Sequence, residues 1–253
     1  MLAELEIGPL TLQTFGVCFA AAFVACGFLL SRRFHELGLS RDWAWEVILA
    51  ALVGGIIGAR LYFVADHWDA FTEDPFGEIF SGSGLVWYGG AAGGAASVIG
   101  WARWRNFLNL TLLDTCGIGL ALGYAIGRIG CQVSGDGDYG KPWDGPWAMS
   151  YPEGVVPTDE KVHPTPVYET LTMLLVAWLL WRLRDRFRPG ILFAAYLVFA
   201  GVERFAVEFL RRNPDVFIGL TAAQLQSAAL FAAGAVWLGR AATSSEGLPR
   251  ASA

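Results

Sequence analysis

Seven long apolar stretches constrain the fold of this chain more than any other feature of its sequence. A helix needs roughly 20 apolar residues to cross the hydrocarbon core of a bilayer. We expect such helices at about 10–31, 44–66, 84–102, 110–128, 166–183, 190–210 and 220–239. No alternating strand pattern competes with this prediction. The sequence therefore predicts an all-α membrane protein with seven transmembrane helices.

The composition supports the membrane class. Charged residues make up 16% of the chain, whereas a soluble domain has about 25%. The four cysteines show no CxxC pairing, so we expect neither a zinc site nor a disulfide framework. The N-terminal segment contains Glu4 and Glu6, unlike the basic start of a signal peptide, and no signal peptide is expected.

The arginines predict the orientation, because cytoplasmic loops carry an excess of Lys and Arg. They cluster after the first, third and fifth predicted helices, at Arg32, Arg33, Arg41, Arg103, Arg105, Arg182, Arg184, Arg186 and Arg188. The N-terminus and the loop at 67–83 contain neither Lys nor Arg. Arg211 and Arg212 run against this trend. We expect the N-terminus outside and the C-terminus in the cytoplasm.

The domain organisation follows from these spans. Residues 1–240 are expected to form a single seven-helix domain, with an irregular outer-face loop excursion at about 129–165. Residues 241–253 are expected to be a disordered cytoplasmic tail. No internal repeat is evident, which disfavours a transporter built from repeated halves.

The stretch 127–140 is unusually polar for a membrane boundary. Arg128 ends an apolar run there, and Cys131, Asp136, Asp138 and Tyr139 follow among several glycines. Polar groups at such a boundary are costly unless they bind something. We interpret this stretch as the rim of a site for an anionic lipid.

Arginines within or at the ends of the predicted spans are functional candidates, because a charge in a bilayer is costly. Arg60, Arg128 and Arg204 come from three helices, and their guanidinium groups suit a phosphate better than lysines would. The alternative for Arg204 is an ion pair with Glu208 one helical turn on. Arg60 is also placed to snorkel to the headgroups.

A second polar cluster lies at 163–169, where the outer loop enters the fifth helix. Thr165 followed by Pro166 is typical of an N-cap with proline at the first helical position. His163 is a candidate general base or hydrogen-bonding group. Tyr168 and Glu169 lie just inside the helix and are candidate site residues.

Five motifs in register together resemble the prolipoprotein diacylglyceryl transferase family. They are Gly-Ala-Arg-Leu-Tyr at 58–62, Tyr-Gly-Gly-x-x-Gly-Gly at 88–94, Gly-Arg-x-Gly at 127–130, His-Pro-Thr-Pro-x-Tyr-Glu at 163–169 and Arg-Phe-x-Val-Glu-Phe-x-Arg at 204–211. The resemblance covers about residues 10 to 240. The glycines of the first two motifs are expected to allow close helix packing.

The resemblance implies a bacterial inner-membrane enzyme that moves the diacylglyceryl group of phosphatidylglycerol onto the lipobox cysteine thiol of a prolipoprotein. A thioether forms and glycerol phosphate leaves. Arg128 and Arg204 would bind the lipid phosphate, and Glu208 would support Arg204. The expected partners are these two substrates and bilayer lipids, with no nucleic acid, no cofactor and a monomeric state. The site would open toward the outer face.

The sequence departs from the family pattern near the site. Cys131 replaces an asparagine, Tyr88 replaces a histidine, and Phe15 and Ala200 replace tyrosines. One extra residue leaves either Asp136 or Asp138 in the place of a glutamate. The catalytic candidates are therefore Arg128, Arg204, Glu208, His163, Tyr88, Asp136 and Asp138. The substrate-binding candidates are Arg60, Arg128, Arg204, Gly89, Gly90, Cys131, Tyr139, Tyr168 and Glu169.

These departures leave alternatives to the family activity. A diverged member would act on a different acceptor, or would bind phospholipid without catalysis. Cys131 is either a thiol activated by the charge of Arg128 or a small residue that packs in place of the asparagine.

Overall fold

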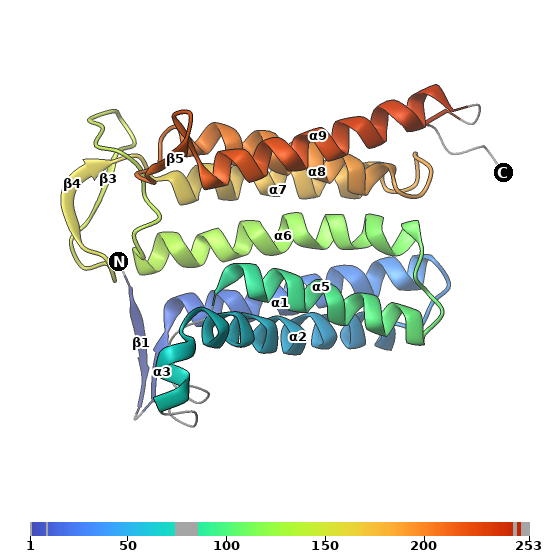
Figure 1. The fold of residues 1–253 in the computed structure, drawn as a ribbon, viewed down its shortest axis with the longest axis horizontal. Coiled ribbons are helices and arrows are strands. Elements are labelled where there is room, and N and C mark those ends of the chain that lie inside the picture. Colours follow the sequence, from blue (N-terminus) through green and yellow to red (C-terminus); the bar gives the residue numbers. More distant parts are fainter. Residues whose placement is uncertain (1, 9, 74–85, 245–246, 249–253) are drawn as a thin grey trace. The chain divides into compact units, whose positions relative to one another are not determined.

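A computed structural model of the chain describes residues 2–8, 10–73, 86–244 and 247–248 (Figure 1). The described part is mostly helical, as the apolar stretches predict. Its long helices are α1 (Thr14–Glu36), α2 (Asp42–Asp66), α5 (Trp87–Trp104), α6 (Leu110–Ser134), α7 (Thr165–Leu183), α8 (Ile191–Glu208) and α9 (Ala222–Thr243). A short helix, α3 (Trp68–Glu73), follows α2.

Short antiparallel hairpins accompany the helices. The paired strands are β1 (Glu4–Ile7) with β2 (Leu10–Gln13), β3 (Met149–Tyr151) with β4 (Thr158–Val162), and β5 (Asp215–Phe217) with β6 (Leu220–Thr221). The helix predicted at 10–31 begins too early in the sequence. Gly8 adopts a positive φ of 62°, and residues 10–13 turn back and pair with β1 as a strand.

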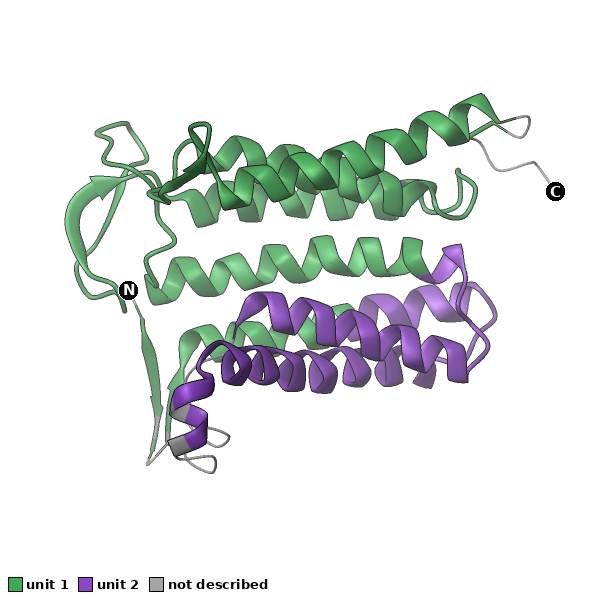
Figure 2. Ribbon diagram, in the orientation of Figure 1, with its two compact units in different colours: residues 1–26, 113–253 green, residues 27–112 purple. Residues whose placement is uncertain are grey.

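Two compact units make up the chain, one of residues 1–26 and 113–253 and one of residues 27–112 (Figure 2). In the second unit, α2 and α5 pack closely through small residues. A Cβ added to Gly58 would lie 2.8 Å from the Cα of Gly93, closer than side chains tolerate. The packing role predicted for these glycines is confirmed.

The first unit contains α6, α7, α8, α9 and the N-terminal part of α1. Gly201 and Gly234 let α8 and α9 approach closely, since a Cβ at Gly201 would lie 2.7 Å from the carbonyl oxygen of Ser227. The carboxylate of Asp114 on α6 accepts hydrogen bonds from the main-chain N–H groups of Gly190 and Phe193, both at 2.8 Å. It thereby caps the start of α8.

Several helix ends lie together at one end of this unit, beside the hairpins β3–β4 and β5–β6 (Figure 1). They are the ends of α6 and α8 and the starts of α7 and α9. Segments far apart in the sequence are therefore neighbours there.

The predicted loop boundary at residue 129 is wrong. Helix α6 continues to Ser134 and ends where Gly135 adopts a positive φ of 62°, as glycine does after many helices. The excursion therefore begins at Gly135, and it holds the hairpin β3–β4 rather than irregular chain alone.

The predicted tail at 241–253 also begins too early, because α9 continues to Thr243. The main-chain N–H of Arg188 donates to the carbonyl of Leu248 at 3.2 Å. The rest of the predicted tail, 245–246 and 249–253, lies outside the described residues.

Three described helices, α1, α2 and α6, are long and apolar enough to cross a membrane. On α7, Leu171, Leu175 and Trp178 are each more than half exposed and share one helix face. Apolar side chains exposed in this way suit contact with lipid.

Candidate active site

Arg128 lies on α6, two turns before its end, and contacts two carboxylates. Its Nε lies 3.0 Å from Oε2 of Glu169, and its Nη1 contacts Asp138. The guanidinium also lies 4.8 Å from the centre of the Tyr124 ring, a cation–π distance. The side chain is 16% exposed, so the charge is held in place yet reachable.

Arg204 on α8 binds the same glutamate. Its Nη1 lies 3.1 Å from Oε1 of Glu169, and its Nη2 lies 2.8 Å from Oε2 of Glu208. The ion pair with Glu208 that the sequence suggested is confirmed. It is not an isolated structural pair, because Glu169 joins Arg204 to Arg128.

Glu169 is the centre of this cluster and its side chain is fully buried. The hydroxyl of Tyr124 donates to its Oε1 at 3.0 Å. The next residue, Thr170, donates to the carbonyl of Ala125 at 3.2 Å and so ties α7 to α6. Packing between the two helices therefore fixes the carboxylate that both arginines bind.

Arg211, which follows α8, completes the cluster. Its Nη2 contacts the Asp138 carboxylate, and its Nη1 donates to the Asp138 carbonyl at 3.1 Å. It also lies 3.7 Å from Glu169 and 3.8 Å from Glu208. Burial opposes ionisation of Asp138, but the charges of Arg128 and Arg211 hold its pKa below its ordinary value. Asp138 is therefore a poor proton acceptor.

Glu208 is fixed from the opposite side by the start of α9. Its Oε1 accepts hydrogen bonds from Thr221 at 2.9 Å and from Asn213 at 2.6 Å. Thr221 is also the N-cap of α9 and accepts from the main-chain N–H of Gln224 at 3.2 Å. One threonine thus serves both the helix cap and the site.

The excursion after α6 brings Asp138 to the arginines. Thr165 was predicted to be an N-cap, which is wrong: it is the first residue of α7, and its hydroxyl donates to the Asp138 carbonyl at 2.5 Å.

Tyr139 is buried and stacks on Tyr151 at 4.9 Å between ring centres. Its side chain packs inside the excursion, and its role in substrate binding stays a prediction.

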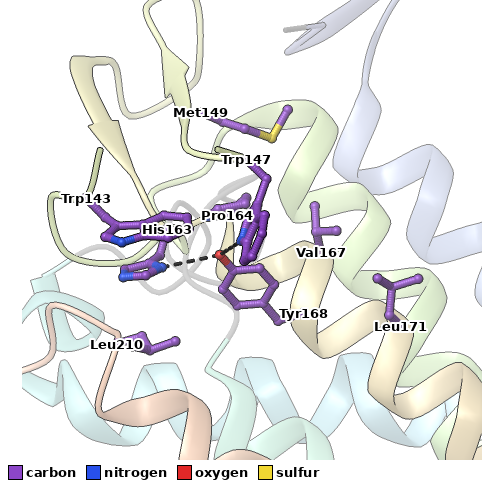
Figure 3. Close-up of a pocket in the computed structure, with 9 residues that line it drawn as sticks. All are labelled: Trp143, Trp147, Met149, His163, Pro164, Val167, Tyr168, Leu171 and Leu210. Carbon is purple, nitrogen blue, oxygen red and sulfur yellow. Dashed lines mark hydrogen bonds between the residues drawn. The ribbon is translucent and has the colours of Figure 1, made fainter. Parts of the chain in front are cut away.

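His163 and Tyr168 line a pocket of about 670 Å³. Figure 3 shows the side chains that line it. The remaining lining residues are Trp143, Trp147, Met149, Pro164, Val167, Leu171 and Leu210. The Trp147 indole donates to the Tyr168 hydroxyl at 2.8 Å, and that hydroxyl lies 3.3 Å from Nδ1 of His163. Burial lowers the pKa of His163.

Cys131 lies buried three residues after Arg128, whose Nη1 is 3.7 Å from its sulfur. Cys131, Asp136 and Asp138 bring possible metal ligands within 4.8 Å of one another. However, both carboxylate oxygens of Asp138 already face guanidinium groups. The two guanidinium groups therefore supply the positive charge that a metal ion would otherwise provide.

The remaining candidates belong to the unit of residues 27–112. Arg60 lies 5.1 Å from the centre of the Phe63 ring. Tyr88 is exposed, Gly89 is buried against α2, and Gly90 packs less tightly there. Their participation in the same site as Arg128 stays a prediction.

The cluster of Arg128, Arg204 and Arg211 with Asp138, Glu169 and Glu208, hereafter the ion cluster, can bind an anion. Guanidinium groups present paired N–H donors that match phosphate oxygens and remain charged when buried. Arg128 and Arg204 are 16% and 22% exposed, whereas Glu169 and Glu208 are fully buried. An incoming anion would therefore meet the arginines.

Comparison with known proteins identifies the family. A family model described as prolipoprotein diacylglyceryl transferase matches residues 3–240. The chain belongs to this family. A phosphatidylglycerol–prolipoprotein diacylglyceryl transferase of Clostridium tetani is 32% identical over 213 residues, covering 83% of this chain and 84% of the relative. One from Dehalococcoides mccartyi is 31% identical over 231 residues, covering 90% and 88%.

The family predicted from the five motifs is therefore confirmed, and with it the transferase class. This member of the prolipoprotein diacylglyceryl transferase family is a mostly helical bacterial membrane protein.

Four residues that contact or belong to the ion cluster are not among the sequence-predicted site residues: Arg211, Tyr124, Asn213 and Thr221. One signal was present for Arg211, which ends the motif at 204–211 and opposes the charge trend of the loops. Tyr124 and Thr221 carried no such signal, because a tyrosine in an apolar helix and a threonine before one are ordinary.

Proposed function

We propose that this chain transfers the diacylglyceryl group of phosphatidylglycerol to the lipobox cysteine thiol of prolipoproteins. The family membership supports this activity. The structural observation that carries it is the convergence of Arg128 and Arg204 on the buried carboxylate of Glu169. These arginines come from α6 and α8 and meet where a phosphate can reach both.

The reaction explains why arginines are needed. The cysteine sulfur attacks the glyceryl carbon next to the phosphate oxygen, the carbon–oxygen bond breaks, and glycerol phosphate leaves. The phosphate gains negative charge as the bond breaks, so Arg128 and Arg204 bind the transition state more tightly than the ground state. Glu169 and Glu208 hold the two guanidinium groups in the required geometry.

The thiol must lose its proton to a base, and His163 is the best placed candidate in its own unit. Its lowered pKa keeps the imidazole neutral near pH 7, so that it can accept a proton. Asp138 is a weaker candidate while its carboxylate is paired with Arg128 and Arg211, because their charges lower its pKa. Tyr88 and Asp136 remain the other proposed participants.

The proposed membrane arrangement has seven spans in one domain, with the N-terminus outside and the C-terminal tail in the cytoplasm. The apolar spans and the arginine-rich loops support it. The ion cluster then lies at the outer end of α6 and α8 and opens to the outer face of the inner membrane. We further propose that the enzyme acts as a monomer without nucleic acid.

The proposed phosphatidylglycerol site also includes Arg60, Gly89, Gly90 and Cys131. Tyr168 is proposed to line the substrate site through the apolar pocket.

Complementation tests the activity directly. A bacterium depleted of its own transferase should regain growth and lipid-modified prolipoprotein when it expresses this chain. Arg128→Ala and Arg204→Ala should each abolish the rescue. Mass spectrometry of a lipobox peptide incubated with the purified protein and phosphatidylglycerol should detect the thioether.

A stable, membrane-inserted protein that neither rescues growth nor forms the thioether would contradict the proposal. It would then favour a phospholipid-binding protein without catalysis, or a different acceptor. Arg240→Ala, an exposed arginine on α9, is the matched control and should leave rescue intact.

A further inference from the structure

Asp138 joins two arginines that come from different parts of the chain. Its Oδ2 contacts Nη1 of Arg128, and its Oδ1 contacts Nη2 of Arg211. One carboxylate thus lies between two guanidinium groups and gives each of them one oxygen. Two oxygens of a phosphodiester can make the same pair of contacts.

The charges of the ion cluster favour such an exchange. The cluster holds three positive charges, on Arg128, Arg204 and Arg211, and two negative charges on Glu169 and Glu208. The Asp138 carboxylate neutralises the one positive charge that remains. A phosphodiester carries one negative charge. Its exchange for the Asp138 carboxylate leaves the balance unchanged, and an uncompensated buried charge, which is strongly destabilising, is avoided.

Among these three carboxylates, Asp138 is the one that can be displaced. The side chains of Glu169 and Glu208 are fully buried, and neutral donors hold them in addition to the arginines. The Asp138 side chain is 29% exposed. Its carbonyl is held separately by Thr165 and Arg211, so the carboxylate can rotate away while the main chain stays in place.

We propose that the Asp138 carboxylate occupies the phosphate position of the phospholipid when no lipid is bound, and that Arg211 is a third phosphate-binding arginine. The lipid phosphate displaces the carboxylate from Arg128 and Arg211, and Asp138 turns toward solvent. This inference rests on the proposed function, because that function places a phospholipid phosphate at Arg128.

The contribution of Arg211 differs from that of Arg204. Arg204 is held by Glu169 and Glu208, whereas Arg211 makes its closest side-chain ion pair with Asp138. Displacement of the Asp138 carboxylate therefore frees Nη2 of Arg211 for the incoming phosphate, while Nη1 stays on the Asp138 carbonyl.

Binding measurements on the purified full-length protein test the proposal. The probe is a short-chain phosphatidylglycerol titrated by calorimetry in detergent. Asp138→Asn removes the competing charge and should tighten binding by about tenfold, equivalent to about 1.4 kcal/mol. Asp138→Ser should act in the same direction. Arg211→Gln should weaken binding.

Glu153→Gln is the matched control, since Glu153 is an exposed carboxylate of the same excursion. This variant should bind phosphatidylglycerol with the affinity of the unmodified protein. A short-chain diacylglycerol, which lacks the phosphate, should bind the protein and Asp138→Asn equally.

Unchanged or weaker phosphatidylglycerol binding by both neutral Asp138 variants would overturn the inference. Failure of both variants to fold would overturn it as well, because Asp138 would then be an indispensable counter-ion. The thioether assay on the unmodified protein distinguishes failure of this inference from failure of the proposed function. If it forms the thioether while the Asp138 variants bind no tighter, only the inference fails; if it forms none, the proposed function fails.

Discussion

Arg128 and Arg204 both bind the carboxylate of Glu169, one at each oxygen. The distances are 3.0 Å from Nε of Arg128 to Oε2 and 3.1 Å from Nη1 of Arg204 to Oε1. Glu169 lies 35 residues before Arg204 in the sequence, and Arg128 lies on yet another helix, α6. A single buried anion thus sets the separation of two cations on different helices.

Glu169→Gln should destabilise the protein and abolish transfer. The amide keeps the size of the side chain but leaves Arg128 and Arg204 without their shared counter-charge. Breaking a buried ion pair by removing one partner costs about 3–5 kcal/mol. Thermal unfolding in detergent measures the loss of stability, and the thioether assay measures activity. Glu153→Gln, the same change at an exposed carboxylate, should leave both unchanged; equal stability of the two variants would contradict the role given to Glu169.

Arg128→Lys and Arg204→Lys should each lower kcat while the protein stays folded. Lysine keeps the charge but lacks the planar fork that reaches two acceptors at once. We expect roughly a 10²–10³-fold loss, as for removal of one donor to a developing oxyanion. Steady-state kinetics with a lipobox peptide measure it. Arg240→Lys serves as the control, and kcat values equal to that of the unmodified enzyme would rule out bidentate binding.

Thr221→Val should weaken both the start of α9 and the support of Glu208. Valine has nearly the shape of threonine but can neither donate to Glu208 nor accept from Gln224. Loss of an N-cap alone costs about 0.5–2 kcal/mol. Thr221→Ser keeps the hydroxyl and should retain most of the stability. A valine variant as stable as the serine variant would show that the hydroxyl does not stabilise the fold.

Gly58→Ala should separate α2 from α5. The added methyl group would lie 2.8 Å from the Cα of Gly93, so the two helix backbones would have to move apart. Overpacking of this kind costs typically about 1–3 kcal/mol. Gly100→Ala on α5 is the matched control, because nothing lies within 4 Å of its added Cβ. Equal unfolding temperatures for the two variants would contradict close packing at Gly58.

His163 should make the protein less stable in mild acid. Burial lowers its folded pKa below the ordinary 6.5, so the unfolded chain takes up the proton first. Stability therefore falls as the pH drops through 6.5 toward the lower folded value. Unfolding temperatures at about pH 7.5 and about pH 5.5 should differ less in His163→Gln than in the unmodified protein. Parallel pH profiles would show that His163 does not contribute.

Much of the candidate site was predictable from local sequence. Arg128, Arg204 and Glu169 each interrupt an apolar run, and the cost of such charges in a bilayer marks them individually. The pair of Arg204 with Glu208 followed from helical spacing. The end of α6 was not predictable from apolar content, because glycines and polar residues continue the helix until Gly135 turns it.

The sequence by itself determined the helical membrane fold, the family and the arginines that carry the charge, because apolar length and short motifs are local properties. Only the tertiary structure decided which carboxylate each arginine binds. It placed Arg211 in the ion cluster and brought Asp138 between Arg128 and Arg211. The physical reason is that ion pairing depends on side-chain atoms within a few ångströms, and helix packing, rather than position along the chain, sets those distances.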